Sequence, residues 1–494
     1  MNPFLSLLSI NKKGRQPLYL QIAGQLTDLI RNGSLPAGQR LMSTRQAADL
    51  LSLHRRTIVR AYEELLAQGW LDSQMGSGTF VARQLPEIHP QKLLKRREIT
   101  RPATTAGFSF DSLPHLNREL PYYTSRYHLD EGFPDSRLAP LEELSRAYKS
   151  QMLTGNPYVR LGYADPMGSS WLREELSSYL NETRGLKTNT ENILITRGVI
   201  MGIYLVSTAL LNRGDLVVVA EKGYQGANNN FLQAGAKLIK IPVDENGMQV
   251  ELLEPLCVKK KIRLVYITSH HHYPTTVPLR VERRIRLLQL AEKYGFIIFE
   301  DDYDYDFHYL SKPLLPLAGS DTSGMVLYCG SFTKTISPAF RVGYLTGSEN
   351  VIRHLSQLRR IIDRQGDSLL ENAMADLLQQ GVVQRHLRKS LRLYKARRDI
   401  FCDLLKVHLG KQLEFQIPDG GMAVWTNFDS GIDLTALSKK ALQQDLYFSD
   451  GRNHHPDWSA SHATRLGFAS STPEELERCV EILTGLMPKS RKQK

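Results

Sequence analysis

A lysine flanked by hydroxyl groups and followed by an arginine is the first set of residues in this sequence that could do chemistry. Lys334 lies in the stretch VLYCGSFTKTISPAFRVGY with Ser331, Thr333 and Arg341, and Asp301 ends another apolar run, FIIFED. A lysine amine can form a Schiff base with pyridoxal phosphate. That cofactor needs a carboxylate to keep its pyridine nitrogen protonated, and hydroxyl groups with an arginine to hold its phosphate. The pattern therefore predicts a pyridoxal phosphate site.

Two other interpretations of Lys334 compete with this one. Ser331 to Lys334 also fits the Ser-x-x-Lys of penicillin-binding acyl enzymes, but the chain has only Ser449-Asp450-Gly451 and no Lys-Thr-Gly to complete that site. Lys334 could also be an ordinary surface lysine. The run of histidines 270–272 suggests a metal, but adjacent residues on an extended chain point to alternate faces, so we expect no metal site.

The elements that must position these residues form a regular pattern from residue 192 onward. Short apolar runs alternate with helical stretches, and the runs are NILIT, LVVVA, KLIKIPV, RLVYITS, FIIFED, MVLYCG and VGYLTG. This alternation predicts an α/β body with a mostly parallel sheet covered by helices. Functional residues in such sheets gather at the carboxyl ends of the strands, where Asp301 and Lys334 fall.

A different pattern precedes this body. Apolar spacing predicts a helix over 18–32, closed by Gly33. Ser43 is the expected N-cap of a short helix, TRQAADLL, and Ser52 of a third, LHRRTIVRAYEELLAQ, which ends at Gly69. Two helices joined by a tight turn indicate a helix-turn-helix, and WLDSQMGSGTFVAR indicates a two-stranded wing.

Positive charge concentrates in this N-terminal part. Residues 1 to 101 hold 15 Lys/Arg against 7 Asp/Glu, in a chain of net charge +12. A basic module joined to a neutral body suggests nucleic-acid binding by the module. The residues expected to reach base edges are His54, Arg55, Arg56, Thr57 and Arg60.

Residues 17 to 82 resemble the winged helix of the GntR family. The matching motifs are Ser43-Thr44-Arg45, the run Arg55 to Tyr62, and Gly76-Ser77-Gly78-Thr79-Phe80-Val81; Met42 stands where a proline is common. The resemblance implies binding of double-stranded DNA, and the expected DNA-binding residues are Arg40, Ser43, Arg45, Arg55, Arg56, Thr57, Arg60 and Gly78.

The body resembles the fold-type-I aminotransferases, and the whole chain, from about residue 15 to 485, resembles the MocR/GabR subfamily of regulators. The matching motifs are Gly162 to Pro166 with Gly168 and Leu172-Arg173, Gly223-Tyr224, Glu300 to Asp304, Ser331 to Lys334 with Pro338 and Arg341, and Arg465 to Phe468.

This second resemblance assigns a role to each residue of the predicted site. It implies that Lys334 carries the internal aldimine and that Asp301 pairs with the pyridine nitrogen. Tyr303 would bind the ring hydroxyl and Tyr224 would stack on the ring. Arg465 would bind an effector carboxylate. Tyr163 would reach the neighbouring subunit's site, which implies a homodimer.

Several residues depart from the family pattern. Val199 and Ile200 replace a Ser/Thr-Gln-like pair that binds phosphate, and Tyr273 stands where aminotransferases usually have Asn. Further departures are His272, Thr276, Asn228 and Ala423. We expect cofactor binding to survive these changes and the effector pocket to be atypical.

Together these observations predict three segments. They are a winged helix-turn-helix at 12–83, a linker at 84–115 that includes the basic segment KLLKRR, and an aminotransferase-like effector domain at 116–488. The predicted function is a pyridoxal-phosphate-dependent transcription regulator that senses an amine or amino acid by external aldimine formation. One alternative is an active aminotransferase that carries a DNA-binding domain, and another is a regulator that has lost the coenzyme.

The cellular location follows from what the sequence lacks. The longest apolar runs, such as Leu216 to Ala220, are far shorter than the ~20 residues that span a bilayer. The start of the chain has no basic residue before its apolar stretch, as a signal peptide would. Four widely spaced cysteines form no CxxC pair. We therefore expect a cytoplasmic protein with reduced thiols and no membrane partner.

Overall fold

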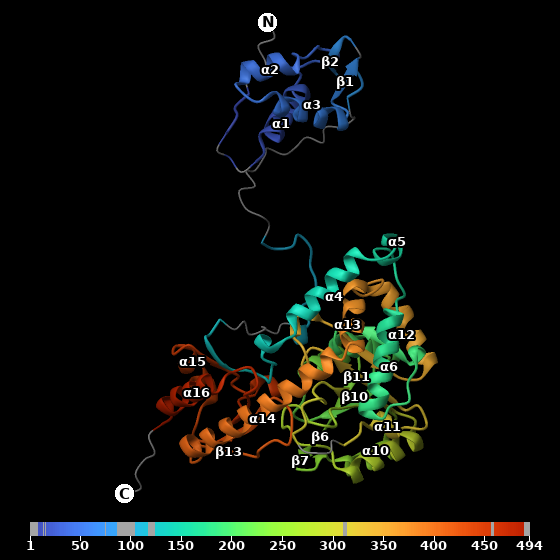
Figure 1. Ribbon diagram of the computed structural model, residues 1–494, viewed down its shortest axis with the longest axis vertical. Helices are drawn as coiled ribbons and strands as arrows, with labels where there is room; N and C mark the ends of the chain where they lie inside the picture. Colours follow the sequence, from blue (N-terminus) through green and yellow to red (C-terminus); the bar gives the residue numbers. More distant parts are fainter. Residues whose placement is uncertain are drawn as a thin grey trace. The chain divides into compact units, whose positions relative to one another are not determined.

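The chain divides into two compact units, Met1–Phe110 and Asp111–Lys494. The structure is a computed structural model, and it describes residues 8–12, 14, 16–74, 76–85, 104–116, 124–309, 314–455 and 459–488. Figure 1 traces the helices and strands of both units. Most of the expected linker, including the basic segment KLLKRR, lies outside the described residues. The predicted boundaries at 83/84 and 115/116 stay predictions.

The N-terminal unit is a small helical bundle with a hairpin. It contains α1 (Leu18–Arg31), α2 (Thr44–Leu51), α3 (Arg55–Ala67), β1 (Leu71–Gln74) and β2 (Gly78–Val81). The two strands pair antiparallel and form the expected wing. Ile22, Leu26, Ile58 and Leu65 are fully buried between the helices, so apolar spacing on α1 and α3 builds the core as predicted.

One expected cap is confirmed and another is wrong. The Ser43 hydroxyl accepts the backbone N–H of Gln46 in a capping box that begins α2. Ser52, the expected cap of the third helix, instead ends α2 in a left-handed conformation, and its N–H bonds back to Ala48 and Asp49. The chain needs two further residues to leave that turn, so α3 begins at Arg55. His54 caps it, because His54 Nδ1 accepts the Arg56 N–H.

The body is built around a seven-stranded sheet, as the described residues show it. In sheet order its strands are β4 (Ile193–Thr196), β12 (Gly343–Thr346), β11 (Val326–Ser331), β10 (Ile297–Asp302), β9 (Ile262–Ile267), β5 (Leu216–Ala220) and β6 (Lys237–Ile241). Only β12 runs antiparallel to its neighbours in this sheet. The predicted mostly parallel sheet is confirmed, and each expected run contains a strand.

Helices cover both faces of this sheet (Figure 1). Phe231 and Phe299 belong to one buried cluster, and Leu287 and Phe296 to another. The helices of this part are α4 (Leu141–Leu153), α5 (Pro157–Arg160), α6 (Ser170–Arg184), α7 (Val199–Leu210), α8 (Gln225–Gln233), α9 (Leu253–Lys259), α10 (Val281–Tyr294), α11 (Leu317–Ser320), α12 (Glu349–Ile362) and α13 (Ser368–Gln379). A short hairpin, β7 (Val243–Asp244) with β8 (Gly247–Met248), follows β6, an edge strand of the large sheet.

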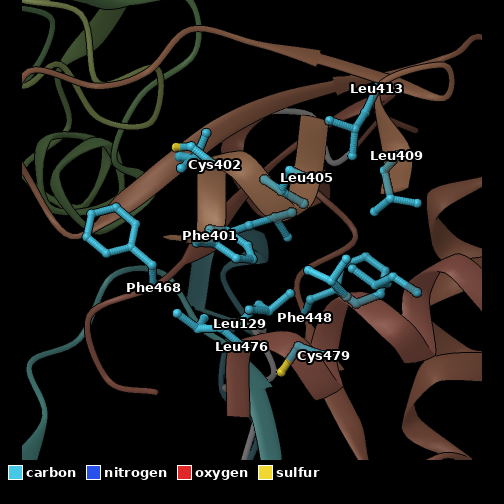
Figure 2. Packing of buried hydrophobic residues seen from close by; sticks show 14 of the residues in the cluster. Leu129, Phe401, Cys402, Leu405, Leu409, Leu413, Phe448, Phe468, Leu476 and Cys479 are labelled. Atoms are coloured by element: carbon cyan, nitrogen blue, oxygen red, sulfur yellow. The ribbon is translucent and has the colours of Figure 1, made fainter. Parts of the chain in front are cut away.

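The long helix α14 (Val382–Leu409) leads into a second, smaller layer. This layer holds the antiparallel strands β13 (Leu413–Phe415), β14 (Ala423–Phe428) and β16 (Ala463–Gly467), the helices α15 (Leu434–Leu442) and α16 (Pro473–Leu486), and a parallel pair of β15 (Leu446–Phe448) with β3 (Tyr127–Leu129). Figure 2 shows its core, where Leu129, Phe401 and Phe448 pack together. Residues from before the large sheet thus join this layer.

A helix that crosses a bilayer must be both long and apolar. In the described part of the chain, none is both long and apolar enough to cross a bilayer.

Candidate active site

The predicted lysine and aspartate lie on adjacent strands. β10 and β11 pair parallel with Asp301 opposite Cys329, so Asp301 and the segment after Ser331 emerge at the same edge of the sheet. Lys334 follows that segment. Its Nζ donates a hydrogen bond to the Gly132 carbonyl oxygen at 2.6 Å and lies 4.1 Å from the Phe133 ring centre.

The electrostatic surroundings of Lys334 favour its neutral form. Burial, with a contribution from the positive charge of Arg465, lowers the pKa of the Lys334 amine to about 8. A larger share of the amine is therefore unprotonated near neutral pH than in an ordinary lysine. Only a neutral amine can attack a carbonyl carbon, so Lys334 has the chemistry of a nucleophile.

Only one of the two carboxylate oxygens of Asp301 accepts a hydrogen bond within the described residues. Its Oδ2 accepts the Tyr266 hydroxyl at 2.6 Å. Its Oδ1 is buried and has no hydrogen-bond partner within the described residues. Burial raises the pKa of this carboxyl to about 7. A buried acceptor without a donor fits a pyridinium N–H, so the residues present fit the cofactor predicted from the sequence.

The other four carboxylates in and just after β10 each have at least one structural partner, although Asp302 Oδ1 and Asp304 Oδ2 are also buried without a hydrogen bond within the described residues. Glu300 accepts the backbone N–H groups of Leu317 and Ala318. The remaining pairs are Asp302 with Tyr328, Asp304 with His271, and Asp306 with Arg184. The histidine run is buried with them. Within the described residues, no group of three or more His, Cys, Asp or Glu could hold a metal ion.

A second group of residues, at the start of α7, has the chemistry to hold an anion. Arg341 has a left-handed backbone, and its Nη2 donates to the Arg197 carbonyl oxygen at 2.6 Å. A Cβ added to Gly198 would lie 2.8 Å from the same nitrogen, so the guanidinium lies against the N-terminus of α7. The first N–H groups of that helix belong to Val199 and Ile200, and such N–H groups attract phosphate.

The two hydroxyl residues lie at the same strand end as Lys334. Ser331 Oγ donates to Thr333 Oγ1 at 2.7 Å and accepts the Thr333 N–H at 2.9 Å. Ser331 also pairs with Gly343 across the sheet. The structure therefore brings Ser331, Thr333 and Lys334 together at the end of β11, as the sequence predicted.

Three tyrosines lie close to one another beside the predicted cofactor residues. The rings of Tyr224 and Tyr273 meet edge to face, with centres 5.6 Å apart. Tyr303 donates its hydroxyl to the His271 carbonyl oxygen at 3.1 Å. A small hollow adjoins Tyr224 and Tyr273, and it is also lined by Val219, Ala220, Gly223, Asn228, Met248, Tyr266, Ile267, Thr268 and His272.

Arg465 reaches the same site from β16. Its side chain is fully buried. Nε donates to the Glu131 carbonyl oxygen at 3.0 Å, and Nη1 donates to the Pro274 carbonyl oxygen at 3.2 Å. The guanidinium carbon lies 5.2 Å from the Tyr273 ring centre. Because these bonds go to carbonyl groups, the charge of Arg465 suits an incoming carboxylate.

Two of the departures from the family pattern have visible structural consequences. Thr276 adopts φ +65°, a conformation that strains a β-branched residue. Ala423 lies against Gly132, where a Cβ on the glycine would be 3.3 Å from Ala423 Cβ. Space around Gly132 is therefore tight.

Tyr163 does not join this group. Its side chain is 83 % exposed, and the Arg364 guanidinium lies 4.9 Å from its ring centre. Its expected role in a neighbouring subunit's site stays a prediction.

The residues expected to bind DNA lie on the N-terminal unit. Most are exposed, and Thr57 is half-buried. Arg55 Nε donates to Thr44 Oγ1 at 3.4 Å, and the Arg60 guanidinium lies 5.6 Å from the Tyr19 ring centre. The exposed residues are Arg40, Ser43, Arg45, Arg55, Arg56 and Arg60. Gly78 begins β2 with φ +117°, and a Cβ added there would lie 3.1 Å from Arg40 Nε.

Sequence reasoning missed four residues of the site. Tyr266 holds Asp301, and the segment Glu131, Gly132 and Phe133 contacts Lys334 or Arg465. The missed segment lies about 200 residues before the lysine in the sequence, with no periodic pattern to point to it. Its only signal was a carboxylate followed by glycine just after a short apolar run, LDEGF.

Comparison with known proteins defines the class. Residues 129–483 match the family described as "Aminotransferase class I and II", and residues 18–81 match "Bacterial regulatory proteins, gntR family". The chain belongs to the aminotransferase class I and II family and carries a gntR-type domain before it, the arrangement of the MocR/GabR subfamily. Pyridoxal phosphate is the cofactor of this domain, and the protein is a transcription regulator that depends on it.

Individual relatives agree with this architecture. The chain is 28 % identical to the "Probable rhizopine catabolism regulatory protein MocR" of Rhizobium meliloti, over 97 % of this chain and 95 % of that protein. It is also 28 % identical to the "HTH-type transcriptional regulator TauR" of Rhodobacter capsulatus, over 95 % and 97 %.

Solved structures resemble the body alone. The multiple substrate aminotransferase of Thermococcus profundus is 26 % identical with a TM-score of 0.68, over 74 % of this chain and 91 % of that chain. LysN of Thermus thermophilus, an α-aminoadipate aminotransferase complexed with N-(5'-phosphopyridoxyl)-L-leucine, is 25 % identical with a TM-score of 0.68, over 73 % and 91 %.

Proposed function

We propose that this regulator works in the cytoplasm and senses a primary amine or amino acid through its cofactor site. The observation that carries the proposal is that two basic groups share one site. Lys334 has an amine with a pKa of about 8, and the buried guanidinium of Arg465 lies close enough to lower that pKa. A nucleophilic amine beside an anchored guanidinium suits a ligand that carries both an amine and a carboxylate.

Different residues of the site would bind the cofactor and the effector. When bound, pyridoxal phosphate supplies an aldehyde that condenses with primary amines. Lys334 would hold the cofactor covalently, and Asp301 Oδ1 would hold the proton on the ring nitrogen. Arg341 and the N-terminus of α7 would bind the phosphate. Arg465 would orient the effector carboxylate.

Sensing requires that the effector change the affinity of the winged helix for DNA. A ligand can shift such an equilibrium only if it binds two states of the body with different affinity. The measurement uses full-length chain loaded with pyridoxal phosphate and an operator selected from a random DNA pool. We expect at least one amino acid to change both the visible absorption spectrum and the operator affinity. A spectrum that changes without any effect on DNA would contradict sensing.

An active aminotransferase is the second candidate, and Lys334 supports it because this amine could also move protons. Tyr273 disfavours it, since that ring occupies the position of the usual Asn. The two candidates differ in their products. An aminotransferase converts the amino acid to a 2-oxo acid with turnover, whereas a sensor releases its effector unchanged. Mass spectrometry of the ligand after incubation with an amino-group acceptor decides between them.

We also infer that the chain acts as a homodimer. Exposed apolar side chains lie near Tyr163 in the sequence, Leu153, Tyr158 and Val159, and another, Ile361, comes three residues before Arg364, whose guanidinium contacts the Tyr163 ring; these four are between 72 % and 90 % exposed. Surfaces of this kind mark protein interfaces. Tyr158→Asp should shift the mass measured by light scattering from dimer to monomer. Val407→Asp, at a residue of α14 that is 77 % exposed, is the matched control and should remain a dimer.

A further inference from the structure

A carboxylate lies beside Arg465 and is fixed by two hydrogen bonds. Glu131 Oε2 accepts the Tyr273 hydroxyl at 3.0 Å, and Oε1 accepts Asn453 Nδ2 at 2.9 Å. The Glu131 side chain is only 14 % exposed. The negative charge therefore has one position, and it is largely shielded from solvent.

Aromatic rings continue from this carboxylate. The Tyr273 and His454 ring centres are 5.5 Å apart, and those of His454 and Trp425 are 5.3 Å apart. The outer part of this wall already contacts a cation, since Lys222 Nζ lies 5.9 Å from the Trp425 ring centre. Aromatic faces combined with a carboxylate are the surroundings that bind ammonium and guanidinium groups in proteins.

The backbone around Glu131 connects these aromatic rings to Lys334 and Arg465. The Glu131 carbonyl oxygen accepts Arg465 Nε, and the next residue, Gly132, accepts Lys334 Nζ. An effector with its amine near Lys334 and its carboxylate at Arg465 would therefore lie close to the Glu131 side chain. A second carboxylate on that effector would meet a like charge, and a second cation would meet an opposite one.

Building on the proposed function, we propose that Glu131 is a specificity-determining residue that selects effectors with a second cationic group. The chemical class is a diamino acid or a related diamine, in preference to neutral and dicarboxylic amino acids. Tyr273, which stands where aminotransferases usually have Asn, donates the hydrogen bond that holds the Glu131 carboxylate in place.

The test compares three amino acids built on the same six-carbon chain, using full-length chain loaded with pyridoxal phosphate. L-lysine, L-norleucine and L-2-aminoadipate end in a cation, a methyl group and an anion. We expect half-saturation of the spectral change at a concentration about tenfold lower for lysine than for norleucine, the effect of one charge-assisted hydrogen bond. Aminoadipate should bind most weakly.

Two variants locate the effect. Glu131→Gln keeps the size of the side chain and one oxygen for the Tyr273 hydroxyl, but removes the charge, so the ratio between lysine and norleucine should fall close to one. Glu142→Gln, at an exposed residue in the first turn of α4, is the control and should keep the wild-type ratio. Cofactor content and thermal unfolding of each variant show that it is folded.

The outcomes separate this inference from the function on which it rests. Equal half-saturation by lysine and norleucine in the wild type, or a Glu131→Gln variant that keeps the preference, overturns the role of Glu131. It would mean that Glu131 only balances the charge of Arg465. A chain in which none of the three compounds alters the spectrum or the DNA affinity, while other amines do, overturns this inference alone. A chain that responds to no amine at all contradicts the proposed function.

Discussion

The Tyr266 hydroxyl donates a hydrogen bond to Asp301 Oδ2 and thereby turns Oδ1 of the same carboxylate into a buried acceptor with no partner among the described residues. Tyr266 lies on β9 and Asp301 on β10, and these strands are neighbours in the parallel sheet. The sheet thus orients the carboxylate before any ligand is present. Such pre-organisation reduces the free energy that cofactor binding must spend on ordering the site.

The Asp301 carboxylate should contribute to the affinity for pyridoxal phosphate. Asp301→Ala should weaken pyridoxal phosphate binding by about tenfold or more, because a charge-assisted hydrogen bond to the ring nitrogen is lost. Tyr266→Phe should weaken it less, since the carboxylate remains. Equilibrium dialysis measures both dissociation constants. Unchanged affinity in Asp301→Ala would remove Asp301 from the cofactor site.

Lys334→Ala should abolish covalent attachment of the cofactor and the response to effector. The fold and much of the DNA affinity should persist, because the substitution removes the bond to Gly132 but little packing. Borohydride reduction of the wild-type protein followed by peptide mass mapping is the direct measurement. A pyridoxyl adduct on any other lysine would show that the site assignment is wrong.

The rate at which the coenzyme-free chain takes up pyridoxal phosphate should depend on pH through Lys334. The neutral amine is the reactive form, so the rate rises with pH, with a midpoint near the pKa of about 8 rather than near 10.5. Arg465 lowers this pKa. Arg465→Gln removes a positive charge and should therefore move the midpoint to higher pH. Stopped-flow absorbance measures the profile, and a midpoint that stays fixed in the variant would show that Arg465 does not act on the lysine.

Binding of the operator should depend on α3. Arg55→Ala or Arg60→Ala should weaken specific binding by ~1 to 3 kcal/mol if each guanidinium contacts a base, while cofactor content stays the same. Arg213→Ala removes one exposed positive charge from the body and serves as the matched control. Gel shifts at fixed salt concentration give the affinities. Equal affinity in all three variants and the wild type would contradict α3 as the recognition helix.

Local patterns explain which parts of the structure the sequence could predict. The strands of the large sheet and the ends of β10 and β11 follow from apolar runs that stop at polar residues, so Asp301 and Lys334 could be found. The start of α3 could not, because Ser52 and His54 are both capable caps and only the left-handed turn at Ser52 decides between them. Glu131 and Tyr266 were missed because their roles depend on contacts between distant segments, which no local pattern records.

The hydrogen bond between Lys334 Nζ and the Gly132 carbonyl oxygen connects two layers of the body. Lys334 extends from the large sheet, whereas Gly132 follows β3, which pairs with β15 in the smaller layer. A lysine whose nitrogen is engaged elsewhere cannot hold that carbonyl in the same way. Any group that occupies the amine therefore competes directly with this hydrogen bond between the two layers, so that chemistry at one nitrogen atom also removes a contact between the large sheet and the smaller layer.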